Sequence, residues 1–258
     1  MATAISKTLT PHRGKFIAAI LALAAGVVLA NEAQRKIFTE RAGAEFQKAQ
    51  ARFQADAANP TNAWQFARAA FDCAEFSTTD AERAALAEQG IAACRQLIAR
   101  NPKSAAAHYY LAMNLGQLAR TKFLGALKLV KEMEREFKRA AELDARLDYA
   151  GPERNLGLLY RDAPGWPTSI GNQRTARYYS EQAVKLAPDY PANPLNLIES
   201  YLQWDERDAA KRELRVLDAL WPAAQTNLTG ERWAPSWEDW STRRNSLRQK
   251  ISETTPPP

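Results

Sequence analysis

The sequence has few of the residues from which most enzyme sites are built. Only two of its 258 residues are histidines and two are cysteines, and no HExxH, CxxC, GxGxxG, GxxxxGK or GxSxG motif occurs. Multi-histidine zinc sites are thereby excluded, and phosphate-binding loops and nucleophile elbows lack their sequence signatures. Acidic residues are plentiful, but they alternate with Lys and Arg, as in KEMEREFKRAAELD, which is typical of a solvated helix face. We therefore expect no enzyme activity, no cofactor and no metal.

Glycine is also scarce, with 11 in the chain, while Ala-rich amphipathic stretches dominate. With 46% hydrophobic and 25% charged residues, the composition predicts a globular, all-helical protein.

Cys73 and Cys94 both lie in apolar helical stretches. In a helical hairpin that turns at residues 77–79 they would lie on the order of 16 Å apart, too far for a disulfide. We expect two free, packed thiols.

Long uncharged runs are absent except near the N-terminus. Lys7, Arg13 and Lys15 precede the apolar run 16–30, and small residues at its end resemble a cleavage site. The run is short for a membrane span and suits a secretory signal peptide, so 1–30 is predicted to be a cleaved signal, with a short membrane anchor as the alternative. Without 1–30 the net charge falls from +6 to +3, which does not indicate nucleic acid binding.

An internal repeat decides the expected fold. Between Pro188 and Pro222, which are 34 residues apart, Leu197 and Tyr201 lie on one helix and Ala210, Leu214 and Leu217 on the next. This spacing resembles the tetratricopeptide repeat (TPR) family. Equivalent patterns upstream end at 102, 145 and 188. We predict an all-α TPR-type solenoid of about four helical hairpins, with unit boundaries 61–102, 103–145, 146–188 and 189–222.

The segments before and after the repeats are predicted to cover the two open ends of this solenoid. Residues 31–60 are predicted to form an amphipathic lead-in helix. Residues 223–252 are predicted to form a Trp-rich capping helix, whose tryptophans cover the end of the solenoid rather than bind a ligand. Thr79 and Ser236 are each followed three residues later by an acidic residue and are expected to start helices as capping boxes. The tail 253–258 is expected to be disordered.

The order of parts is similar to one looser group. WQFARAAFDCAEF, then AAAHYYLAMNLG and the long FKRAAEL helix resemble the regulator of microtubule dynamics-like TPR proteins over roughly residues 60–220. The resemblance concerns architecture and brings no catalytic motif. The signal-like N-terminus differs from that of a cytosolic microtubule protein, so a microtubule role is not carried over.

The TPR resemblance implies a concave groove lined by the first helix of each unit. Carried over onto this sequence, the groove positions are Gln65 and Asp72 in the first unit, Tyr109, Met113 and Gln117 in the second, Arg154, Leu158 and Arg161 in the third, and Leu195, Glu199 and Gln203 in the fourth. Such a mixed surface suits an extended peptide or a partner helix. Arg154 and Arg161 either clamp a partner carboxylate or form ion pairs within the chain, with Asp162 as one candidate. The single histidine beyond the signal, His108, is expected to pack in the core.

RDAPGWPTSIGN (161–172) interrupts the third unit between its two helices. Two prolines predict a stiff, decorated turn, with a binding lip as the alternative. Trp166 is expected to pack onto a neighbouring helix, and Asn172 or Ser169 to cap the following one.

The sequence indicates the class of function but not the partner. The leading hypothesis is a non-enzymatic scaffold, exported to a periplasmic or extracellular compartment, that binds a protein or peptide in its groove. The alternatives are a carrier of a small apolar ligand and, if 16–30 stays uncleaved, a membrane-tethered adaptor. No nucleic acid partner is expected.

Overall fold

The computed structural model describes residues 32–122 and 125–252, and within these ranges the chain is helical, without a strand. The predictions for 1–30 and 253–258 therefore concern residues outside the described ranges. The helices are α2 (Glu32–Ala55), α3 (Pro60–Glu75), α4 (Asp80–Arg100), α5 (Ala105–Arg120), α6 (Ala126–Leu143), α7 (Leu147–Asp162), α8 (Gln173–Leu186), α9 (Ala192–Gln203), α10 (Arg207–Asn227), the short 3₁₀ helix η2 (Glu231–Trp233) and α11 (Ala234–Ser252).

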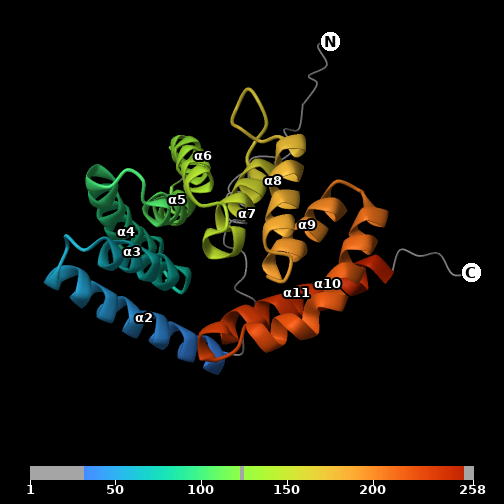
Figure 1. Cartoon of the computed structure of the whole chain (residues 1–258), viewed down its shortest axis with the longest axis horizontal. Coiled ribbons are helices and arrows are strands. Elements are labelled where there is room, and N and C mark those ends of the chain that lie inside the picture. The colour runs from blue at the N-terminus through green and yellow to red at the C-terminus, as the bar shows by residue number, and fades with distance from the viewer. Residues whose placement is uncertain (1–31, 123–124, 253–258) are drawn as a thin grey trace, which may run out of the picture.

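Eight of the helices form four successive pairs, α3/α4, α5/α6, α7/α8 and α9/α10 (Figure 1). The second helix of each pair contacts the first helix of the next, as stacked hairpins require. First helices also contact each other along the array, whereas neighbouring second helices are not in comparable contact. The array therefore curves with α3, α5, α7 and α9 on its inner side. The expected TPR-type solenoid is confirmed.

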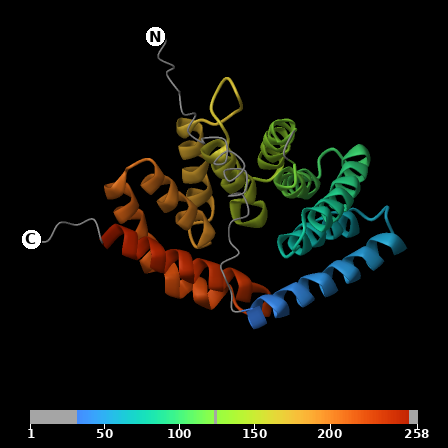
Figure 2. The same cartoon turned by 180° about the vertical axis from the view of Figure 1, so that it is seen from behind.

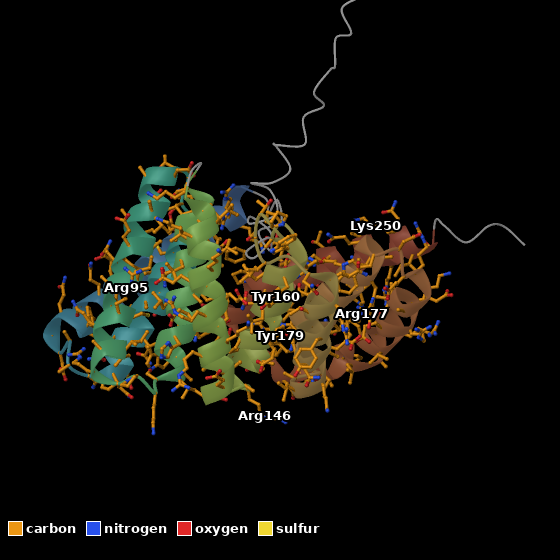
Figure 3. All side chains as sticks on the ribbon, turned by 90° about the horizontal axis from the view of Figure 1, so that it is seen from above. Arg95, Arg146, Tyr160, Arg177, Tyr179 and Lys250 are labelled. Atoms are coloured by element: carbon orange, nitrogen blue, oxygen red, sulfur yellow. The ribbon has the colours of Figure 1, made fainter. Side chains whose placement is uncertain are left out.

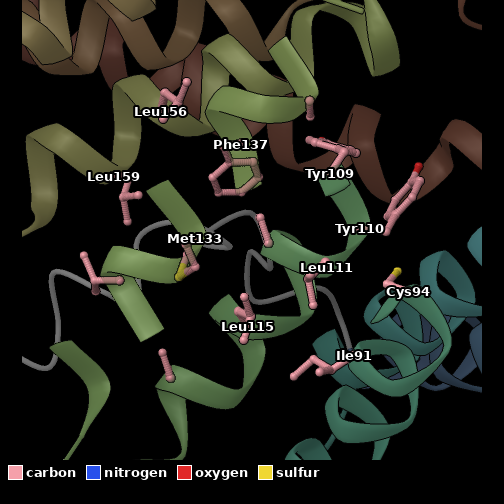
Figure 4. Close-up of a cluster of buried hydrophobic side chains, with 14 of the residues drawn as sticks. Ile91, Cys94, Tyr109, Tyr110, Leu111, Leu115, Met133, Phe137, Leu156 and Leu159 are labelled. Carbon is pink, nitrogen blue, oxygen red and sulfur yellow. The ribbon is translucent and has the colours of Figure 1, made fainter. Parts of the chain in front are cut away.

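The core consists of separate clusters of buried side chains along the array, and the largest is formed by residues of α3 to α8. Tyr109, Leu115, Met133 and Phe137 are almost fully buried where α5 and α6 meet their neighbours (Figure 4). Close helix approach needs a small residue at Gly157, where an added Cβ would lie 2.4 Å from Ser180 Oγ. Each pair thus buries an apolar flank that it could not bury alone.

Local caps fix where several helices begin. The Thr79 side chain accepts from the N–H of Glu82, and the Glu82 carboxylate accepts from the N–H of Thr78, which confirms the predicted start of α4. The second predicted capping box is wrong. Ser236 lies inside α11, because η2 leads directly into a helix that begins at Ala234.

α11 covers the C-terminal end of the array, contacting both α9 and α10. Trp221, Trp237 and Trp240 meet edge to face in this cap, and the Trp237 indole N–H donates to the carbonyl of Leu228 at 2.6 Å. The N-terminal helix α2 and the C-terminal cap approach each other (Figure 2). There the guanidinium of Arg41 in α2 donates to the carboxylate of Glu231 in η2 at 2.8 Å.

Candidate functional site on the inner face

The inner face is the side of α3, α5, α7 and α9 that lies inside the curve, where the TPR resemblance places the eleven predicted groove residues. The structure buries several of them. Tyr109, Gln117, Leu158 and Leu195 are at most 7% exposed, because neighbouring helices cover them; Leu195, for example, packs in the cluster that α9 forms with α10 and α11. These four serve packing, so their assignment as ligand contacts is corrected.

Arg154 is the centre of a buried polar network between the second, third and fourth units. Its guanidinium donates to the Asp148 carboxylate at 3.1 Å and to the carbonyls of Asp148 and Tyr149 at 3.2 and 3.1 Å. Tyr109 donates its hydroxyl to the same carboxylate at 2.7 Å, and the guanidinium lies 5.0 Å from the ring centroid of Tyr190. With these partners inside the fold, Arg154 has little capacity left for a partner's carboxylate.

The network holds an unusual backbone segment. Asp148, Tyr149 and Ala150 all have φ between 50° and 61°, so the first turn of α7 is left-handed. Each non-glycine residue in this region costs about 1–2 kcal/mol. Tyr149 stacks on Tyr190 at 4.5 Å, and Asn193 donates to the Tyr149 carbonyl at 3.0 Å. The helical patterns in the sequence do not predict this turn, and the only local signal for it is the Gly151-Pro152 pair that follows.

Arg161 is likewise occupied. Its guanidinium forms two parallel bonds to the Asp162 carboxylate, at 2.7 and 2.8 Å, and both side chains are 8% exposed. Of the two interpretations left open by the sequence, the structure therefore has the internal ion pair. In the second unit, Gln117 donates to Glu75, which also accepts from Arg120 at 3.0 Å.

The fourth unit is covered by the chain itself. Arg243 of α11 binds both carboxylate oxygens of Glu199 at 2.8 Å, and Tyr190 and Trp240 meet edge to face. α11 therefore lies on the inner side of α9, and of the fourth-unit candidates only Gln203 is exposed.

The first two units keep an open part of the inner face, carried by α3 and α5. Gln65 and Met113 are partly exposed there, and Asp72 has 51% of its side chain exposed. Arg68, which the groove offsets did not select, lies 3.6 Å from Asp72 and is 52% exposed. Although water reaches Asp72, burial within the curve of the array raises the pKa of its carboxyl to about 6. These residues form what we call the open inner face.

His108 lies outside this face, in the core between α5 and α6. Its Nδ1 is 2.6 Å from the Glu136 carboxylate and its Nε2 is 3.1 Å from the carbonyl of Pro102. No group of three or more His, Cys, Asp or Glu in the described ranges could hold a metal ion. Cys73 and Cys94 are free.

The loop between α7 and α8 departs from one expectation. Trp166 does not pack on a helix but is 89% exposed, because the loop projects beyond the ends of the neighbouring helices (Figures 1 and 2). Asn172 caps α8 as expected, accepting from the N–H of Thr175 at 2.9 Å. Behind the loop, Tyr160 and Tyr179 stack between α7 and α8 (Figure 3).

Comparison with known proteins agrees with this architecture. The family model for regulator of microtubule dynamics protein 1-3 matches residues 31–149. A thermophilic TPR protein of Thermus thermophilus is similar in structure, with a TM-score of 0.60, 17% identity, and coverage of 92% of this chain and 98% of that chain. Yeast Tom70 gives a TM-score of 0.33 at 11% identity, covering 99% of this chain and 68% of that one. No curated protein matches the sequence.

The chain therefore has the fold of a TPR-type helical solenoid. In its first half it also resembles the regulator of microtubule dynamics proteins, as the sequence patterns indicated. Repeat solenoids of this kind form extended concave surfaces, which they use for binding. No helix in the described ranges is long and apolar enough to span a bilayer.

Proposed function

We propose that the protein is a non-enzymatic TPR scaffold that binds a segment of a protein partner on the open inner face. The observation that carries this proposal is a difference in solvent exposure along the inner side. α11 covers the fourth unit, whereas polar and apolar side chains of α3 and α5 are exposed to solvent. A partner segment fits where groups are accessible and already held on rigid helices.

Arg68 and Asp72 are the residues best suited to recognise the segment. Their single 3.6 Å contact is loose, and both side chains are half exposed, so each can exchange its partner for a charged group of the ligand at little cost. Gln65 and Met113 add a hydrogen-bonding amide and an adaptable apolar contact. Because the curve partly desolvates Asp72, a cation placed there meets a stronger field than it would on a convex surface.

A charge exchange tests the site without changing the net charge. The double variant Arg68→Glu, Asp72→Arg reverses the pair on the inner side. The matched control reverses Arg139 and Glu142, an exposed pair of α6 at 2.9 Å. Proteins cross-linked to the full chain in its native host should be lost from the inner variant and kept by the control. Identical partners for both variants would reject the site.

We also propose that the N-terminal segment directs export, with retention as a membrane anchor as the alternative. The support is the apolar run 16–30 behind three basic residues. N-terminal sequencing of the protein from its host distinguishes the two: a start near Asn31 supports export, and an intact Met1 supports the anchor. No observation in the described residues favours the small-ligand carrier.

A further inference from the structure

Trp166 is the most exposed of the large hydrophobic side chains in the described part of the chain, at 89%. An indole of about 150–250 Å² is costly to leave in water, and tryptophan is usually well buried. It stands at the apex of the α7–α8 loop, where Gly165, Pro167 and Thr168 are also exposed. The open inner face does not involve this loop, so the exposed indole needs another explanation.

The loop is rigid rather than loose. The N–H of Gly171 donates to the carbonyl of Pro164 at 2.7 Å, and the N–H groups of Thr168 and Ser169 both donate to the carbonyl of Gly165. Gly171 is pressed so closely against the opposite strand of the loop that a Cβ would lie 2.0 Å from the Ala163 carbonyl oxygen. A preorganised apex loses little conformational entropy when it binds.

The same bonds satisfy part of the backbone of the loop. Pro164 and Pro167 have no N–H, and the three donors just named are satisfied within the loop. An unsatisfied N–H is a main cost of moving backbone out of water into an apolar medium. These features lower that cost for part of the loop.

The loop and most of α8 carry no acidic residue. From Ala163 to Ser180 the chain has no acidic residue, and it carries Arg174 and Arg177. Arg177 is paired with Glu206, while Arg174 is exposed and has no ion pair within the described residues. Tyr178, 57% exposed, follows Arg174 by one helical turn, so a cation and an aromatic ring line the same face of α8 below the loop.

We propose that the apex of this loop, with Arg174 and Tyr178, binds the interface of an anionic lipid bilayer. Trp166 enters the headgroup region, where tryptophan is enriched in membrane proteins, and Arg174 contacts the lipid phosphates. A basic residue near an anionic surface contributes about 1 kcal/mol. One indole and one arginine give weak, reversible binding, so the contact orients a protein that a second interaction already holds near the membrane.

Fluorescence quenching tests the proposal on the full chain. The probes are vesicles of brominated phosphatidylcholine, with and without phosphatidylglycerol. Because the apolar run 16–30 can bind lipid by itself, the readout is the quenching that disappears in Trp166→Phe, which removes the indole but keeps an apolar side chain. The other tryptophans are buried or only partly exposed, so the difference reports position 166.

On anionic vesicles we expect wild type to be quenched and Trp166→Phe to lose at least half of that quenching. Arg174→Gln should reduce this Trp166-dependent quenching a few-fold on anionic vesicles, because it removes the attraction of one cation to the lipid phosphates. The control Val216→Ser, which removes an exposed apolar side chain from α10, should be quenched like wild type. Equal quenching of wild type and Trp166→Phe would overturn the proposal, as would a Trp166-dependent quenching that is equal on neutral and anionic vesicles.

Discussion

The guanidinium of Arg154 lies 3.1 Å from the Asp148 carboxylate and also donates to the main chain of the left-handed turn in which Asp148 lies. One side chain thus neutralises a carboxylate and satisfies the carbonyls of a strained segment. The turn sits where the second, third and fourth units meet, so the stacking of these units depends on it.

Replacement of Arg154 by Met should destabilise the fold by about 3–5 kcal/mol, because it leaves the Asp148 carboxylate without its ionic partner and the Asp148 carbonyl without its donor, while Asn193 still donates to the Tyr149 carbonyl. Arg154→Lys should recover little, since one ammonium cannot reach the same set of acceptors. Urea unfolding followed by circular dichroism measures the effect. Arg174→Met, at an exposed position, should change stability by less than about 0.5 kcal/mol. A loss below about 1 kcal/mol for Arg154→Met would contradict the role given to this network.

Ala150→Gly should leave stability unchanged or raise it by up to about 1 kcal/mol. Ala150 has φ of 61°, which glycine adopts without the steric cost that Ala incurs. Ala67 is equally buried but lies in right-handed α3, so Ala67→Gly should cost about 1 kcal/mol or more. Thermal unfolding of the two variants gives opposite or clearly unequal shifts if the turn is left-handed. Equal losses would speak against it.

Glu153 should make stability depend on pH near neutrality. The residue is 6% exposed, its Oε2 has no hydrogen-bond partner among the described residues, and burial raises the pKa of its carboxyl to about 7. The folded state therefore holds the proton more tightly than the unfolded state, whose pKa is near 4.5. The contribution of Glu153 to stability is present at acid pH and is lost as the pH rises from about 5 to 7.

Glu153→Gln keeps the side chain neutral, so the variant should be more stable than wild type above pH 7, by up to about 3 kcal/mol. The difference should shrink toward pH 4.5, where wild type is also neutral at this position. Chemical unfolding across this range measures it, with Glu142→Gln on the exposed side of α6 as the control. A difference that does not vary with pH would rule out ionisation of Glu153 as the cause.

Gly157→Ala should destabilise the third unit by about 1–3 kcal/mol, since the new methyl would meet Ser180 Oγ at 2.4 Å and its backbone N at 3.1 Å. Removing the hydroxyl with Ser180→Ala should restore part of the loss but not all, because the backbone contact remains. Gly43→Ala is the control: its added methyl meets nothing within 4 Å and should stabilise α2 by up to about 1 kcal/mol. Full rescue by Ser180→Ala would show that α7 and α8 can separate more easily than the structure indicates.

The candidate site could be predicted only in part. Groove offsets depend on which face of a first helix turns inward, and this periodicity is visible in the sequence. Gln65, Asp72 and Met113 are at least partly exposed, and their role in a groove stays a prediction. The periodicity does not show how neighbouring helices pack, so it could not tell that Tyr109 and Leu195 are enclosed. Nor does it show which arginines find partners within the chain. Arg161 is followed directly by its partner Asp162, but Arg154 depends on Asp148 in a turn whose only sequence signal is the Gly151-Pro152 pair that follows it.

By itself, the sequence determined the class of fold, because apolar residues at helical spacing, repeated every 34 to 43 residues, can bury their surface only by stacking hairpins on one another. It also determined the start of α4 and narrowed the cap of α8 to Ser169 or Asn172, since caps act within a few residues of the chain. The tertiary structure decided which part of the inner side stays accessible. That outcome depends on contacts between segments far apart in the chain, above all the ion pair between Arg243 of α11 and Glu199 of α9. Local sequence patterns do not predict such contacts, because they describe only residues close together in the chain.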